Sequence, residues 1–283
     1  MNLQNILSEI EKTDPDVYDR LDTRRNMMKN FAKTSGRIAL ASIPFALGSM
    51  FQKAYSSPTA PTDLILDTLN FALTLEYLES NFYIKAVASG IAPSGDAMNA
   101  LTTIRDHENE HVNFLKTAIT AAGGTPVSFT ADSFDFTAKG TFPGVFSDYG
   151  TMLAVAQTFE DTGVRAYKGQ AGNLITNNDY LTAALQIHSV EARHAAHIRE
   201  MRKAANLLIP AGVDVKPWIT LDQSGIGSAA VQPSYDGEQN VTQAGVTITN
   251  IGGQSISAAA ASEAFDEPLT KEQITAIVTP FFA

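Results

Sequence analysis

Residues 191–194 read EARH and residues 108–111 read ENEH, so a Glu-x-x-His pair occurs twice in this chain. Both pairs lie in stretches with the apolar periodicity of an α-helix. In a helix, residues three positions apart share one face. Each pair therefore places a carboxylate and an imidazole side by side, pointing in the same direction.

A second type of pair precedes each of the first. Residues 76–83 read EYLESNFY and residues 160–167 read EDTGVRAY, which gives a glutamate followed by a tyrosine seven positions later in both stretches. The order along the chain is Glu-x6-Tyr, Glu-x-x-His, Glu-x6-Tyr, Glu-x-x-His. The two glutamates of each half are separated by nearly the same number of residues along the chain, so the pattern indicates an internal repeat of two helices.

Start and stop signals around these pairs predict four long helices. We expect them to run from Pro61 to about Ser89, from near Ser94 to the glycines at 123–124, from about Ser147 to Gly172, and from the cap at 177–179 to about Leu208. The links within each half are short, whereas residues 125–146 form a long connection between the halves. The fold class is therefore all-α, a four-helix bundle with one long crossover.

The acids of these pairs fall where core residues belong. Glu76, Glu108, Glu160 and Glu191 each continue an apolar stripe at three- and four-residue spacing. Four carboxylates in one apolar core repel one another and lose hydration, at a cost of several kcal/mol each, unless they are neutralised or bind metal. Four carboxylates and two imidazoles balance the charge of two divalent cations, so the sequence predicts a two-metal site.

These residues resemble the ferritin-like di-metal carboxylate superfamily over about residues 60–209, and the Glu-x6-Tyr pairs are similar to those of its rubrerythrin-like branch. The leader and long tail are similar to bacterial ferritin-like proteins of the desiccation-associated type. The resemblance implies two iron or manganese ions, bridged by Glu108 and Glu191. The implied metal ligands are Glu76, Glu108, His111, Glu160, Glu191 and His194. Tyr83 and Tyr167 are expected to hydrogen-bond these ligands or to serve as core tyrosines.

The chain departs from this family at the residue before each Glu-x-x-His pair. Several relatives carry an aspartate there to orient a ligand histidine, whereas this chain has His107 and Val190. The ring N–H groups of the ligand histidines must find other partners, and Asp106, His107 and His188 are the candidates. We expect His107, His188 and His197 to be surface or supporting residues, and Glu79 to be either an extra ligand or a solvated acid.

Composition excludes several kinds of chemistry. The chain of 283 residues contains no cysteine, which rules out disulfides, thiolate metal sites and iron–sulfur clusters. The formal net charge is −10, and phosphate binding needs a basic face, so nucleic acid is not an expected partner. Carboxylate and imidazole ligands favour iron, manganese or zinc.

Three segments are expected: a leader over residues 1–56, the bundle over 57–209 and a C-terminal extension over 210–283. The leader contains TRRNMMK at 23–29 followed by an apolar run, which resembles a twin-arginine export signal and predicts a periplasmic protein. The alternative is an N-terminal helix that packs on the domain or on a membrane surface, in a cytoplasmic or membrane-associated protein. In the extension, 241–251 alternates like a strand, and 268–282 predicts a short helix with a Thr270–Gln273 capping box.

Three functions remain open at this stage, and a homo-oligomer is possible with each. The first is a redox enzyme whose metals react with peroxide or dioxygen, and peroxide dismutation suits a chain with no built-in electron donor. The second is ferroxidase and iron handling, with Fe(II) as substrate. The third is a structural or desiccation-protective protein whose metal only stabilises the bundle.

Overall fold

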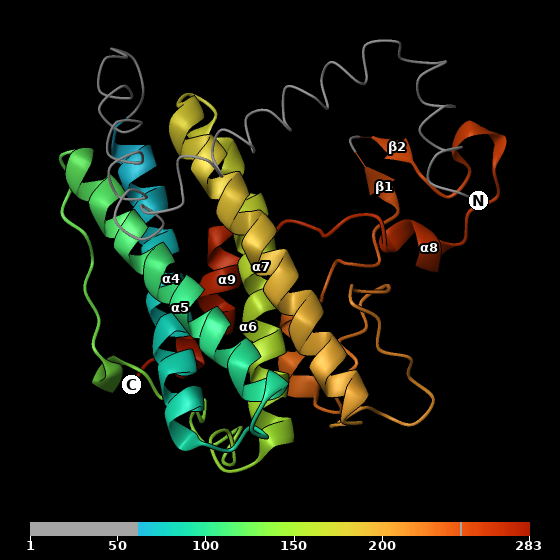
Figure 1. The fold of residues 1–283 in the computed structure, drawn as a ribbon. Coiled ribbons are helices and arrows are strands. Elements are labelled where there is room, and N and C mark those ends of the chain that lie inside the picture. Colours follow the sequence, from blue (N-terminus) through green and yellow to red (C-terminus); the bar gives the residue numbers. More distant parts are fainter. Residues whose placement is uncertain (1–61, 244) are drawn as a thin grey trace, which may run out of the picture. The chain divides into compact units, whose positions relative to one another are not determined.

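The computed structural model describes residues 62–243 and 245–283, so the predicted export leader lies outside the described residues. Four long helices run side by side in Figure 1: α4 (Thr62–Ser89), α5 (Asp96–Ala121), α6 (Tyr149–Gln170) and α7 (Asn178–Ala204). Helix α4 packs mainly against α5, and α6 packs mainly against α7. The prediction of an all-α, four-helix bundle with one long crossover is therefore confirmed. None of the described helices is long and apolar enough to cross a membrane.

Side chains at the helix ends explain where the helices begin and stop. The Asn177 side chain accepts hydrogen bonds from the backbone N–H groups of Asp179 and Tyr180, which caps α7 at the predicted position. The predicted end near Leu208 is wrong, because α7 stops at Ala204. Asn206 and Leu208 both have positive φ angles, which a helix does not allow, and Arg202 donates to the carbonyl of Leu208.

The long crossover between α5 and α6 is held by aromatic packing. It contains one short 3-10 helix, η2 (Ala131–Ser133), and otherwise runs as turns and extended chain. Its phenylalanines pack against α4, α6 and the C-terminus; for example, the Phe82 and Phe136 ring centroids lie 5.5 Å apart. Residues Phe134 and Phe282 also form a β-bridge. The crossover thus contributes four buried side chains to the core: Phe134, Phe136, Ala138 and Val145.

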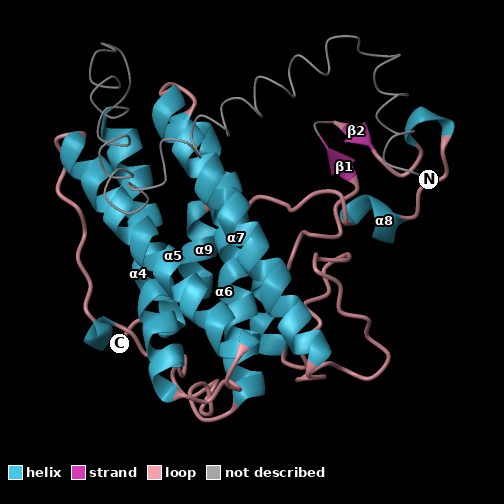
Figure 2. Cartoon of the chain, in the orientation of Figure 1, coloured by secondary structure: helices cyan, strands magenta, loops and turns pink. Residues whose placement is uncertain are grey.

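Short elements make up the C-terminal extension (Figure 2). They are η4 (Ala229–Ser234), β1 (Thr242–Gln243), β2 (Val246–Thr247), η5 (Ile251–Gly253), α8 (Ala258–Ser262), α9 (Lys271–Val278) and η6 (Thr279–Phe281). Of these, η4 and α9 contact α6. The 3-10 helix η3 (Ala171–Leu174) lies earlier in the chain, at the end of α6. The predicted strand is a small antiparallel hairpin of β1 and β2. The predicted last helix is α9, and its Thr270–Gln273 capping box is present.

Buried polar side chains fasten this extension to the outer faces of α6 and α7. Every residue of α6 from Met152 to Tyr167 is buried. Arg165 donates to the backbone carbonyls of Ser234, Asp236 and Glu267 and pairs with the Glu238 carboxylate. On the same side, Asp161 accepts hydrogen bonds from Arg199 and from the Tyr235 hydroxyl. The outer face of α6 is therefore polar yet inaccessible to water, because the extension supplies its partners.

Candidate metal centre

The four long helices deliver all six predicted ligands to the middle of the bundle. Glu76 comes from α4, Glu108 and His111 from α5, Glu160 from α6, and Glu191 and His194 from α7. The four glutamates have no solvent exposure, and the two histidines are buried as well. None of the six points to bulk solvent, as expected for residues on the core stripe of each helix.

The six residues form two overlapping groups. The first group is Glu76, Glu108, His111 and Glu191, and the second is Glu108, Glu160, Glu191 and His194. Within each group, one nitrogen or oxygen atom per residue lies within 4.8 Å of all the others. Glu108 and Glu191 belong to both groups. Each of the two groups could hold a metal ion, and they overlap at the two glutamates that the resemblance implies as shared ligands.

The histidine rings lie close to several carboxylates, yet many of the nitrogen and oxygen atoms have no hydrogen-bond partner. Nδ1 of His111 lies 3.1 Å from Glu76 Oε2, 3.1 Å from Glu108 Oε2 and 3.2 Å from Glu191 Oε1. Nδ1 of His194 lies 2.9 Å from Glu108 Oε1 and 3.2 Å from Glu160 Oε2. One ring nitrogen cannot serve several oxygens with a single proton. Among the described residues, the buried side-chain atoms without a hydrogen bond include Glu108 Oε1, Glu160 Oε2, both Glu191 carboxylate oxygens and His194 Nδ1.

Such unsatisfied atoms are uncommon in folded proteins and call for an explanation. Here five of the seven such atoms in the described residues belong to the same two groups. Carboxylate oxygens and imidazole nitrogens that face one another with too few protons for hydrogen bonds are suitable ligands for divalent iron or manganese. The buried acidic and histidine groups could therefore hold metal.

The pKa values of the cluster show how strongly the protein alone disfavours four charged carboxylates. Burial raises the pKa of Glu76 to about 7 and that of Glu191 well above its usual range. Burial also acts on Glu108, but the close contacts of its carboxylate with the His111 and His194 rings outweigh it and lower the pKa of Glu108. Burial opposes a charged His194, yet the Glu160 and Glu108 carboxylates raise its pKa to about 11. Without a cation, the cluster must take up protons to limit its negative charge.

The two tyrosines bond crosswise between the halves of the repeat. The Tyr83 hydroxyl, on α4, donates to Glu160 Oε1 on α6. The Tyr167 hydroxyl, on α6, donates to Glu76 Oε1 on α4. Burial and the neighbouring carboxylates raise the pKa of both tyrosines, so both stay protonated and act as donors. Each tyrosine therefore orients the glutamate of the opposite half, which the sequence spacing alone could not show.

His107, the residue before the first Glu-x-x-His pair, is the partner of the His194 ring. Nδ1 of His107 lies 2.9 Å from Nε2 of His194, and the two rings stack. Burial, with His194 nearby, lowers the pKa of His107, so it is neutral near pH 7 and can accept a hydrogen bond. This contact turns Nδ1 of His194 toward the carboxylates. Of the other candidates, His188 contacts the Val164 carbonyl, while Asp106 pairs with Arg105.

A fifth carboxylate, that of Glu79, reaches the cluster. The alternative of a solvated acid is wrong for it, because Glu79 is buried, and burial together with Glu191 raises its pKa well above the usual range. A Cβ atom placed on Gly163 would lie 3.2 Å from both Glu79 Oε1 and Glu191 Oε2. Glycine at this position in α6 thus leaves room for the two carboxylates. The last histidine, His197, is exposed, as expected.

Comparison with known proteins agrees with this geometry. The family model of the ferritin-like domain matches residues 65–204, which span the four long helices and all six candidate ligands. Neither a search of curated proteins nor one of solved structures finds a match to the chain.

Proposed function

Because residues 65–204 form a ferritin-like domain, we propose that the buried cluster binds two iron or manganese ions and uses them in redox chemistry with a small oxidant, either peroxide or dioxygen. Glu76 and His111 would hold one ion and Glu160 and His194 the other, while Glu108 and Glu191 belong to both groups and would be available to either ion. Four carboxylates offset the charge of two divalent ions.

The observation that carries the proposal is the set of unsatisfied buried atoms shared by two overlapping groups. A structural site is usually closed by protein ligands, whereas a catalytic site keeps coordination positions open. Six residues shared between two ions leave such positions for an oxidant. Iron or manganese bound there would supply the electron transfer that protein side chains cannot.

The protein's own contribution is to orient the ligands and exclude water. Tyr83 and Tyr167 hold one oxygen each of Glu160 and Glu76, which leaves the second oxygen of each carboxylate facing the cluster. The His107 contact fixes the ring of His194. Buried apolar side chains such as Ile104 surround the acids and keep bulk water from reactive species.

Metal analysis of matched variants tests the binding part of the proposal. Purified protein loaded with Fe(II) without air, or with Mn(II), should carry two ions per chain. Glu108→Gln removes the charge of a bridging carboxylate and should lower the content clearly, whereas Glu110→Gln alters an exposed glutamate on the same helix and should not. Equal metal content in both variants would contradict the assignment.

Turnover separates the redox proposal from its alternatives. Oxygen release from peroxide, absent in Glu160→Ala, would support a dismutase of the catalase type. Oxidation of excess Fe(II) by dioxygen without peroxide turnover would favour ferroxidase and iron handling. Stoichiometric metal with neither reaction would favour a structural or protective role, as a desiccation-related protein would require. Export through the leader and assembly into a homo-oligomer remain separate proposals.

A further inference from the structure

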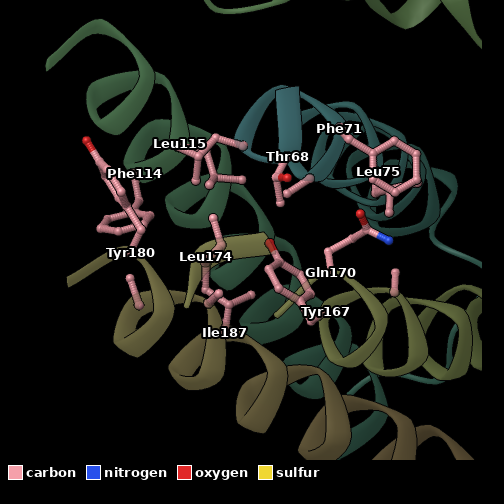
Figure 3. A pocket seen from close by; sticks show the side chains of 15 residues that line it. Thr68, Phe71, Leu75, Phe114, Leu115, Tyr167, Gln170, Leu174, Tyr180 and Ile187 are labelled. Atoms are coloured by element: carbon pink, nitrogen blue, oxygen red, sulfur yellow. The ribbon is translucent and has the colours of Figure 1, made fainter. Parts of the chain in front are cut away.

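An apolar pocket lies between the four long helices, next to the acidic cluster. Figure 3 shows its labelled walls: Thr68, Phe71 and Leu75 from α4, Phe114 and Leu115 from α5, Tyr167 and Gln170 from α6, Leu174 from η3, and Tyr180 and Ile187 from α7. The cavity volume is about 20 Å³. A single water needs roughly 10–15 Å³ on this measure, so the pocket accepts a molecule of one or two heavy atoms.

The inner wall of the pocket adjoins the cluster along the bundle axis. Leu115 lies one helical turn after His111, and Ile187 lies one turn before Glu191. Ala72 lines the pocket one turn before Glu76. Three of the four helices therefore pass directly from pocket wall to candidate metal ligand. A molecule in the pocket is within one turn of the cluster.

Tyr167 separates the two spaces. Its ring lines the pocket, and its hydroxyl donates to Glu76 on the cluster side. The ring and the neighbouring leucines present carbon atoms to the pocket, while the polar end of the tyrosine is already satisfied. Movement of this one side chain would join the pocket to the acids.

The pocket offers little to a polar guest. The Thr68 hydroxyl donates to the Leu64 carbonyl, and the Gln170 carbonyl oxygen accepts from Asn173. Water in a protein cavity needs two to four polar partners, and an apolar cavity of this kind stays dry and takes up apolar gases such as xenon. Hydrogen peroxide has the same need for hydrogen bonds as water. Dioxygen has none.

We propose that this pocket binds dioxygen and supplies it to the metal cluster past Tyr167. The inference rests on the proposed redox function and narrows it, because it makes dioxygen, not peroxide, the oxidant that enters from this end of the bundle. The occupant follows from three features of the pocket: its size, its carbon lining and its distance of one helical turn from the ligands.

Xenon is the probe for the binding step, and its use requires no metal. Crystals of the protein under xenon pressure should show xenon in the pocket. Ala184 lines the pocket on α7, so Ala184→Leu should fill the space and abolish the xenon peak. Ala184→Val is the smaller change, used in case the leucine variant does not fold, and it should weaken the peak. Ala204→Leu, on the exposed end of the same helix, should leave the peak unchanged. Absence of xenon from the wild-type pocket would overturn the inference.

Kinetics of the iron-loaded protein test the supply step. Ala184→Leu or Ala184→Val should raise the KM for dioxygen roughly tenfold, as one or two added carbon groups do in an apolar site, at unchanged iron content and unchanged rate with peroxide. Wild-type KM values in both variants, despite loss of xenon, would overturn the supply role. If the wild-type protein binds no metal, the proposed function fails, while the xenon experiment still decides whether the pocket binds an apolar gas.

Discussion

Arg165 offers the sharpest test of how the C-terminal extension is held, and Arg165→Met is the change to make. The Arg165 guanidinium is almost fully buried and makes four contacts with the extension. It lies 2.6 Å from the Ser234 carbonyl, 2.8 Å from those of Asp236 and Glu267, and 2.7 Å from Glu238 Oε1. Methionine keeps much of the apolar stem and removes every donor.

The expected loss of folding stability follows from the groups that Arg165→Met leaves without a partner. Glu238 would keep only the Glu267 backbone N–H as a partner, and three backbone carbonyls would lose their donor. Breaking a buried ion pair by removing one member costs about 3–5 kcal/mol. For a described region of this size, that is a fall in Tm of about 6–20 °C.

The loss should also depend on pH. Burial already raises the pKa of Glu238 to about 7, although Arg165 lowers it. Without Arg165 this pKa rises further, so the folded variant holds a proton that the unfolded chain releases above its ordinary pKa. Stability of the variant therefore falls as pH increases, and the loss relative to wild type should be smaller at pH 5 than at pH 8.

Chemical denaturation at both pH values measures this loss, and limited proteolysis shows whether the extension has been released. Arg193→Met, on the exposed face of α7, is the matched control and should change stability little. A loss below about 1 kcal/mol for Arg165→Met, the value of an exposed ion pair, would refute the reasoning.

Three further predictions concern the cluster and the leader. Metal-free protein should be less stable at pH 9 than at pH 6, because Glu76 and His194 have raised pKa values and their stabilising contribution is lost as pH rises through them. A Tm of the metal-free protein that is the same at both pH values would contradict the assignment. Metal affinity should instead rise between pH 6 and pH 9, because the ligands must lose protons to bind metal. Tyr167→Phe removes a hydrogen bond to a carboxylate and should cost about 1.5–3 kcal/mol by denaturation, with both metal ions retained; loss of one ion would show that the hydroxyl is needed for binding. Replacing Arg24 and Arg25 with lysine should trap full-length protein in the cytoplasm of its host, and normal export of that variant would exclude a twin-arginine signal.

Most of what could be predicted from the sequence, both for the fold and for the candidate site, came from the internal repeat. Two Glu-x-x-His pairs and two Glu-x6-Tyr pairs at matched spacing fix the number of helices, their buried faces and the meeting point of the acids. These are local rules of helix periodicity, and they hold because each acid interrupts an apolar stripe. The capping boxes and turns are local as well, so Asn177 and Thr270 could be assigned from sequence.

Contacts between distant segments could not be predicted in this way. Helical periodicity places Tyr83 on the same face as Glu76, yet its partner is Glu160, because the partner depends on how α4 and α6 pack. The burial of Glu79 depends on the space left by Gly163 on another helix. The polar residues on the outer face of α6, such as Arg165, resemble a solvated surface in sequence. Only the folded extension shows that they are buried.

Glu79 and Gly163 occupy equivalent positions in the two halves, each three residues after the first glutamate of its half. A symmetric pair of identical hairpins would put either two acids there, facing each other in the core, or two glycines with a void between them. The halves of this chain avoid both outcomes by differing at this one position.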